Sequence, residues 1–148
     1  MLAVKENQKH LYEDIKEYFE LSEIKERLKT SGCYVRTFEK AHGQLETREY
    51  YQSDDIAWLD GRRDWQGLKT IGMVETTLVK GEHKRVERRY FISSVAPDIA
   101  LFAKAVRTHW SIEAMHWILD VTFKEDANTT IDKTAVMNQN IIRKWALA

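Results

Sequence analysis

The chain has 148 residues, 43% of them hydrophobic and 31% charged, which is the composition of one ordinary globular domain. Its 23 basic and 23 acidic residues balance, so net charge gives no sign of nucleic-acid binding and any phosphate-binding site must be local. No apolar run reaches the roughly 20 residues needed to span a bilayer, and the amino terminus lacks a signal-peptide core, so we expect a cytoplasmic protein that makes no membrane contact.

The first predicted element is an amphipathic helix from Asn7 to about Lys29. Its apolar residues recur at steps of three and four among charged ones, with a candidate break at Leu21-Ser22. Ahead of this helix stands a short apolar segment, Leu2-Ala3-Val4. Because a strand of three residues is poorly explained on its own, we expect it to be the end of a buried strand whose neighbours lie outside this chain.

The spacing of apolar residues then changes to two, which predicts four strands, over residues 33–38, 45–51, 70–79 and 86–93. A turn is predicted at His42-Gly43, and the short polar connection from Lys80 to His83 predicts a hairpin. The four strands are expected to form one antiparallel sheet. The single cysteine, Cys33, is interpreted as a small apolar residue of the first strand, and it excludes an internal disulfide and a cysteine-rich zinc site.

Two helices are predicted after the strands. Pro97, the single proline, stands where a helix should begin, and a long helix is expected from Asp98 to at least Leu119. A polar turn at residues 126–130 precedes a last helix from about Thr134 to the end. The order of helix, four strands, helix and helix predicts an α+β fold.

One face of the long helix carries a polar stripe. At about 100° per residue, four ionisable side chains fall within an arc of roughly 60°: His109, Glu113, His116 and Asp120. Large apolar residues flank the stripe on both sides: Val106, Trp110 and Trp117, and Ile112, Met115 and Leu119. Because buried carboxylates and imidazoles are costly unless paired or bound to a metal, the stripe is predicted to be partly buried or to line a cleft, and it is a candidate site.

Other interpretations of the stripe stay open. His109–Glu113 and His116–Asp120 are each four residues apart and could be ordinary helix-surface pairs. Each such pair stabilises a helix by about 0.2–0.5 kcal/mol. The same spacings could share a zinc or manganese ion, although one helix rarely supplies a complete ligand set. Nucleophilic catalysis at Cys33 or at a serine lacks an adjacent base, and no glycine-rich phosphate loop is found.

Two basic clusters are candidates for local phosphate binding, although such clusters are more often solvated edges. The denser cluster comprises Lys84, Arg85, Arg88 and Arg89, and the second comprises Arg62 and Arg63. Neither has a spacing that distinguishes the two interpretations.

Several sequence blocks resemble a known family in the same order along the chain. The most specific is the tryptophan-rich segment from His109 to Glu113, continuing from His116 to Asp126. Further blocks span residues 2–8, 42–48, 65–69, 71–75 and 89–94. Together they resemble the carboxy-terminal part of ISAs1-family transposases, the H-repeat-associated proteins of the IS4-like DDE group, over essentially the whole chain.

This resemblance implies part of an RNase H-like catalytic domain spanning residues 1–148. Residues 1–30 would be a strand end and a helix, residues 31–95 a four-stranded antiparallel insertion, and residues 97–148 the carboxy-terminal helices. In such transposases three carboxylates hold two Mg²⁺ ions, which activate water and then a DNA 3′-hydroxyl. The third carboxylate falls on Glu113, as catalytic residue and metal ligand, and the other two would precede this chain.

The resemblance also implies DNA as the partner, at the ends of an insertion sequence. Tyr, Arg and Lys of the broader IS4-like signature fall here on Val106, His109 and Asp120, so only the glutamate is kept. His109, when protonated, could still meet a phosphate, and Arg107, Lys5 and Asn7 are further candidate contacts. Trp110 could stack on a base, although a tryptophan pair with Trp117 is also typical of core packing.

Three functions are compatible with these patterns. The first is part of a DDE transposase that is inactive alone. The second is a regulatory module that pairs with full-length transposase subunits or occupies DNA ends and so inhibits transposition. The third is a small metal-dependent hydrolase built on His109, Glu113 and His116.

Overall fold

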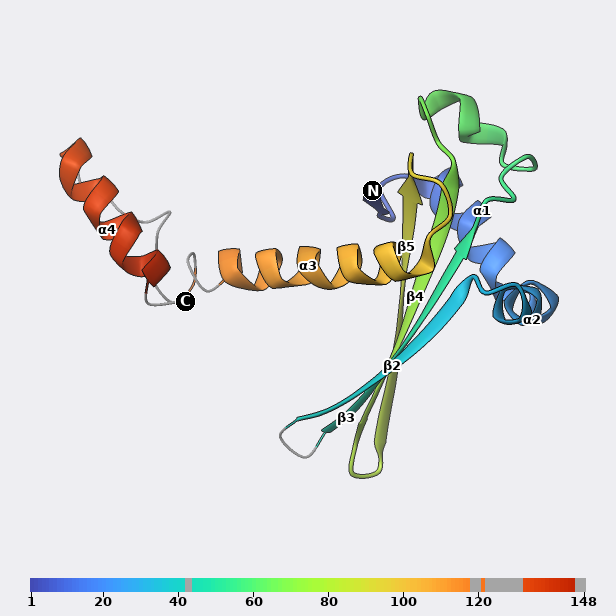
Figure 1. The fold of residues 1–148 in the computed structure, drawn as a ribbon, viewed down its shortest axis with the longest axis horizontal. Helices are drawn as coiled ribbons and strands as arrows, with labels where there is room; N and C mark the ends of the chain where they lie inside the picture. The colour runs from blue at the N-terminus through green and yellow to red at the C-terminus, as the bar shows by residue number, and fades with distance from the viewer. Residues whose placement is uncertain (42–43, 118–120, 122–131, 146–148) are drawn as a thin grey trace. The chain divides into compact units, whose positions relative to one another are not determined.

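The computed structural model describes residues 1–41, 44–117, 121 and 132–145 of the chain. Only the backbone is described at residues 41, 61, 63, 110–117, 133, 139–140 and 143–145. Within these ranges it is a mixed α+β fold built on one antiparallel sheet (Figure 1). The residues divide into two compact units, Met1–Ala103 and Lys104–Ala148. No described helix is both long and apolar enough to cross a membrane.

The sheet has five strands in the order β1-β5-β4-β3-β2. They are β1 (Leu2–Val4), β2 (Tyr34–Ala41), β3 (Gln44–Ser53), β4 (Thr70–Lys80) and β5 (His83–Ser93). The four strands expected from the sequence are confirmed as β2 to β5, each somewhat longer than predicted. The predicted hairpin is confirmed as well, since Lys80 pairs with His83 and Gly81 takes the positive φ of 58° that this tight turn requires.

The expectation that the opening strand lacks neighbours in this chain is wrong. β1 pairs antiparallel with β5, with Leu2 opposite Ile92 and Val4 opposite Tyr90, so the sheet has five strands rather than four. Val4 is buried in the core. Three residues carry too little pattern to reveal a partner almost ninety positions away, because strand pairing is decided by tertiary contacts rather than by local spacing.

The helix predicted at the front of the chain is broken at the expected place. It forms α1 (Lys9–Glu20) and α2 (Ser22–Thr30), separated by Leu21 in an extended conformation. Both helices pack against one face of the sheet (Figure 1). Their apolar side chains form the main core with side chains of β3, β4 and β5: Leu11, Ile15, Tyr18, Phe19, Leu28, Tyr51, Ile71, Met73, Tyr90 and Ile92.

A short 3₁₀ helix, η1 (Asp60–Asp64), lies between β3 and β4 along the chain. Cys33 is half-buried against the main core and stands one residue before β2 rather than inside it. The predicted turn at His42-Gly43 lies outside the described residues. Away from α1 and α2, the strands continue as a long twisted ribbon (Figure 1).

The two carboxy-terminal helices are α3 (Ile99–Trp117) and α4 (Lys133–Trp145). The sequence placed them within a few residues of these bounds, although the expected end of the first at Leu119 and the polar turn at residues 126–130 lie outside the described residues. Asp132 caps α4, since its carboxylate accepts hydrogen bonds from the backbone N–H groups of Thr134 at 2.8 Å and Ala135 at 3.1 Å.

Candidate functional site

The helix that carries the predicted polar stripe begins at a well-defined cap. The carboxylate of Asp98 accepts a hydrogen bond from the backbone N–H of Leu101 at 2.9 Å, as an N-cap residue does. The Asp98 N–H in turn donates to the side-chain oxygen of Gln52, on β3, at 2.9 Å. Gln52 is buried and donates to Thr70 on β4, whose hydroxyl donates to the carbonyl of Val95. The start of α3 is therefore tied to the sheet through two buried polar side chains.

The first turn of α3 approaches the sheet face opposite to α1 and α2. Phe102 is buried there and lies directly above Gly72 of β4. Its ring makes edge-to-face contacts with Phe91, at a centroid distance of 5.6 Å, and with Tyr50, at 6.4 Å. Such aromatic pairs favour one defined ring position. Phe102 therefore fixes the first turn of α3 on this face of the sheet.

The structure places the members of the predicted stripe unequally. His109 is exposed on α3, as is its neighbour Arg107. Glu113 and His116 belong to the same helix by their backbone, but their side chains lie outside what the structure describes, as does all of Asp120. The expected burial of the stripe therefore stays a prediction for its last three members, while its first member is solvent-accessible.

The remaining predicted DNA contacts divide in the same way. Lys5 and Asn7 are both exposed, in the connection between β1 and α1. Trp110 lies within α3, and its side chain is outside the described part, so its role in stacking or packing stays a prediction. Among the described residues no three His, Cys, Asp or Glu side chains come together as a metal site. The metal interpretations of Glu113 thus rest on the sequence.

The denser basic cluster is not one patch, because successive residues of a strand point to opposite faces. Lys84 and Arg88 of β5 face the helix side of the sheet, and Arg85 and Arg89 face the other side. On that other side, Arg85 and Arg89 both pair with Glu87, at 3.8 and 2.7 Å. The four basic residues are close in sequence, but they do not form one positively charged surface on this strand.

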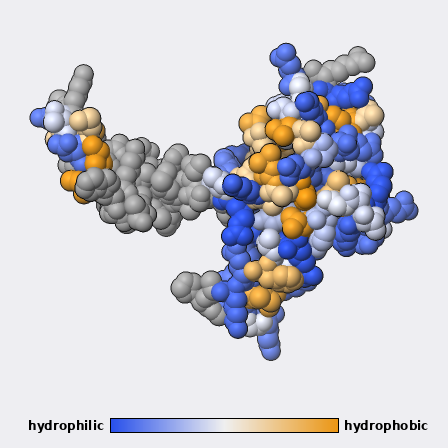
Figure 2. Space-filling model, in the orientation of Figure 1, coloured by the Kyte–Doolittle hydropathy of each residue, from blue (hydrophilic) through white to orange (hydrophobic). Residues whose placement is uncertain are grey.

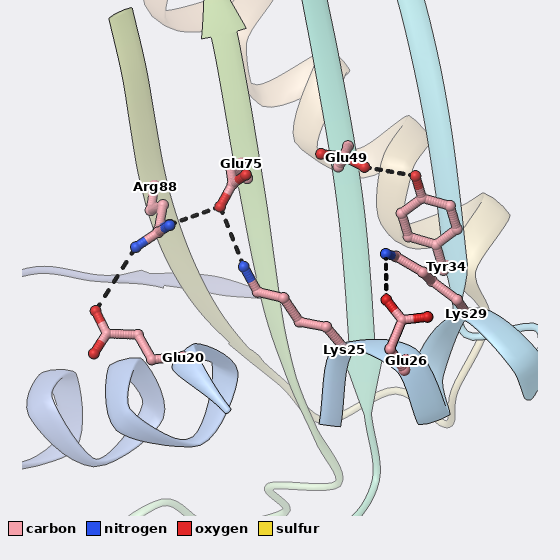
Figure 3. A network of polar contacts seen from close by, with 8 residues as sticks. All are labelled: Glu20, Lys25, Glu26, Lys29, Tyr34, Glu49, Glu75 and Arg88. Atoms are coloured by element: carbon pink, nitrogen blue, oxygen red, sulfur yellow. Dashed lines mark hydrogen bonds and ion pairs between the residues drawn. The ribbon is translucent and has the colours of Figure 1, made fainter. Parts of the chain in front are cut away.

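A polar network that the sequence did not predict joins the helices to the sheet (Figure 3). Glu75 of β4 lies at its centre, with an oxygen 2.7 Å from Nε of Arg88 on β5 and 3.3 Å from Nζ of Lys25 on α2. Arg88 also reaches Glu20 at the end of α1, at 3.7 Å. Burial alone would raise the pKa of Glu75, yet the Arg88 hydrogen bond and the Lys25 charge together lower it.

A second part of the network lies nearer the sheet edge (Figure 3). The Tyr34 hydroxyl donates to the Glu49 carboxylate at 2.7 Å, from β2 to β3. Burial, followed by this hydrogen bond, raises the pKa of Tyr34 to about 12. Nζ of Lys29 lies 5.9 Å from the centre of the Tyr34 ring and 2.8 Å from Glu26 on the same helix. Alternation along the strands could have indicated these residues, but only their register identifies the partners.

Comparison with known proteins supplies the class of protein. The chain is 36% identical over 152 aligned residues to the "Putative transposase YncI" of Escherichia coli O157:H7, which covers 99% of this chain and 38% of that protein. It is 33% identical to the "H repeat-associated putative transposase YhhI" of Escherichia coli (strain K12), over 85% of this chain and 34% of that protein. The "Putative protein YbfL" of the same strain is 34% identical over the same shares. No family model and no solved structure matches the chain.

These similarities extend over the sheet and the helices together, not over one short motif. The chain belongs to the same sequence family as these transposase-named proteins. It spans between 34% and 38% of the length of the three relatives.

Proposed function

We propose that this chain is the part of an ISAs1-type DDE transposase that supplies the third catalytic carboxylate, Glu113, for DNA strand cleavage and transfer. The observation that carries the proposal is the 36% identity to a transposase-named protein over 99% of the chain. The segment around Glu113 adds the family signature, from His109 to Glu113 and from His116 to Asp126.

Its place on a helix supports Glu113 as the catalytic ligand. It belongs to α3, whose backbone is helical from Ile99 to Trp117. A residue on a regular helix is positioned more precisely than one on a loop, which is what a catalytic ligand requires. The RNase H-like character of the full domain is part of this proposal.

Mg²⁺ is the expected cofactor, and a glutamate oxygen is the hard donor that it prefers. When bound, it would stabilise the attacking and leaving oxygens of the phosphoryl transfer. One carboxylate cannot fill an octahedral ligand set, so we assign the other two acids to family sequence beyond this chain. About a third of the relatives' length is matched here, which leaves room for them. The chain alone is therefore expected not to cleave DNA.

Five other residues of this chain are proposed to contact DNA rather than the metal. His109 and Arg107 are exposed on the same helix, and their cationic forms would meet phosphates. Lys5 and Asn7, also exposed, are weaker candidates in the β1–α1 connection. Trp110 would stack on a base.

A chimera tests the assignment of Glu113. This chain would replace its homologous segment in the YncI protein, and the hybrid would be assayed with Mg²⁺ on DNA carrying that element's ends. We expect cleavage by the hybrid and its loss with Glu113→Gln, by on the order of a thousandfold or more, because the amide cannot serve as an anionic metal ligand.

The matched control is Glu23→Gln, which makes the same chemical change at an exposed position of α2. It should leave cleavage unchanged. Undiminished cleavage by the Glu113→Gln hybrid would refute the assignment, and Mg²⁺-dependent nicking by the chain alone would refute its inactivity.

A further inference from the structure

The sheet extends beyond α1 and α2 toward the ends at which β2 connects to β3 and β4 connects to β5. This extended part carries a distinctive surface on the same face that α1 and α2 cover nearer the core. Strand register places residues of β2, β3, β4 and β5 side by side in rows on this face. The innermost of three rows belongs to the Glu75 network, and two rows lie farther out. The rows are Arg36·Glu49·Glu75·Arg88, then Phe38·Thr47·Thr77·Val86, then Lys40·Leu45·Val79·Lys84.

The two outer rows contain two lysines and no acidic residue. Lys40 and Lys84 are both exposed, one on β2 and one on β5, and neither forms an ion pair with a carboxylate among the described residues. Strands lie about 4.8 Å apart, so the two lysines flank the apolar centre at a separation of about 14 Å. Arg36 lies on the same face of β2 in the innermost row, opposite Glu49 in register.

The opposite face of the same strands is different. There Arg48 pairs with Glu46, and Arg85 and Arg89 pair with Glu87. These five charged side chains thus compensate one another locally, and Lys80 of β4 also lies on this face. On the first face, by contrast, Lys40 and Lys84 lie in rows that contain no carboxylate.

Large apolar side chains are exposed between these cations. Phe38 is 60% exposed, Val86 46% and Leu45 43%. The guanidinium of Arg36 lies 4.5 Å from the centre of the Phe38 ring, so a cation and an aromatic face are presented together. Figure 2 shows apolar side chains gathered among hydrophilic ones on this extended end of the sheet. Exposed apolar groups framed by charge are typical of an interaction surface.

We propose that this outer sheet face, defined as Arg36, Phe38, Lys40, Leu45, Lys84 and Val86, binds a DNA strand with unpaired bases. Lys40 and Lys84 would neutralise phosphates, and a base would stack on Phe38 beside Arg36. Cations that follow a backbone together with an aromatic platform are the features of single-strand recognition. This inference rests on the proposed function in one respect, the choice of DNA rather than another polyanion. The residues of the outer sheet face are distant in sequence from the signature around Glu113.

Fluorescence anisotropy with the full chain tests the surface. A labelled single-stranded oligonucleotide and the duplex of the same sequence would be titrated in chelator, so that no metal-dependent step contributes. We expect tighter binding of the single strand, with an affinity that falls as salt rises. The slope of log K against log salt should be reduced by about 0.7 for each phosphate contact removed.

A pair of neighbouring residues provides the control for charge. Lys84→Glu reverses a charge on the outer sheet face and should weaken binding by on the order of tenfold, since a phosphate contact becomes a repulsion. Arg85→Glu makes the same reversal one residue away, on the opposite face, where Arg85 is 76% exposed. It should change affinity by less than about twofold.

The aromatic platform is tested at Phe38. Phe38→Ala should weaken single-strand binding by about tenfold, within the range for one stacked base, while Phe38→Tyr, which keeps the ring, should retain it. The three positions of these four variants are all exposed, so circular dichroism spectra should match that of the unchanged chain.

Any one of three results with DNA would contradict the proposal that the outer sheet face binds unpaired DNA. They are no DNA binding at low salt, equal losses with Lys84→Glu and Arg85→Glu, and duplex binding that is as tight as single-strand binding and insensitive to Phe38→Ala. Binding instead to an acidic peptide or to a second copy of the chain, without DNA binding, would also overturn it. The Glu113 chimera reads out cleavage, so the two proposals can fail separately.

Discussion

The ring of Phe102 occupies the space in which any side chain at position 72 would have to lie. A Cβ atom built on Gly72 would come within 2.5 Å of Cζ and 2.8 Å of Cε2 of that ring. The ring is itself held between Phe91 and Tyr50, so it cannot move aside cheaply. Glycine at this point of β4 is what lets α3 begin so close to the sheet.

Gly72→Ala is therefore expected to destabilise the fold by about 1–3 kcal/mol through overpacking, despite the smaller chain entropy that alanine loses on folding. Urea denaturation followed by circular dichroism would measure the change. In a Phe102→Leu background, which vacates part of this space, the cost of Gly72→Ala should be smaller by at least about 0.5 kcal/mol. Equal costs in both backgrounds would show that the contact is not responsible.

Tyr50→Phe is expected to be neutral or stabilising by up to about 1 kcal/mol. The Tyr50 hydroxyl is fully buried without a hydrogen-bond partner in the described part of the chain, so removing it relieves a desolvation cost. Tyr18→Phe is the matched comparison, because the Tyr18 hydroxyl lies 2.7 Å from Oγ of Ser53 and accepts a hydrogen bond from Arg27 at 2.8 Å. That change should cost about 1–2 kcal/mol in the free energy of unfolding. The reverse ranking would contradict the assigned contacts.

Stability should fall in acid through Glu75. Its pKa in the folded chain lies below the ordinary value of 4.5, so the pairing with Arg88 and Lys25 stabilises the fold above that pH. The contribution is lost as the pH falls through the folded-state pKa. Glu75→Gln should lower the free energy of unfolding at neutral pH by about 1–3 kcal/mol and flatten its dependence on pH below 4.5.

Glu26→Gln is the control for this acid dependence. Glu26 pairs with Lys29, but its side chain is 70% exposed, so the pair should contribute less than about 0.5 kcal/mol. An acid profile that is unchanged by Glu75→Gln would show that other carboxylates dominate it.

Alkaline pH should weaken the fold through Tyr90. Burial, and then the nearby Tyr12, raises the pKa of Tyr90 to about 12 from its ordinary value of 10.0. The neutral phenol is therefore favoured by folding, and its contribution is complete below pH 10.0 and lost as the pH rises through about 12. The difference in phenolate absorbance between the unchanged chain and Tyr90→Phe should titrate near 12. A difference titrating at 10.0 would contradict this burial.

Local patterns in the sequence determined most of the secondary structure. Steps of three and four residues gave α1 and α2 with their break at Leu21, and alternation gave β2 to β5, because each period follows from the geometry of its own element. The polar stripe with Glu113 was likewise visible from spacing alone, and similarity to transposase-named proteins agrees with the family that it resembled.

Only the tertiary structure decided which segments meet. It paired Leu2–Val4 with β5, gathered Glu75, Arg88 and Lys25, and set Phe102 over Gly72. Strand register also placed neighbouring basic residues on opposite faces of β5. Lys84 lies on the outer sheet face, and Arg85 lies beside Glu87 on the other face. These relationships join residues far apart in sequence or depend on strand register, and a single chain's local periodicity carries no information on either.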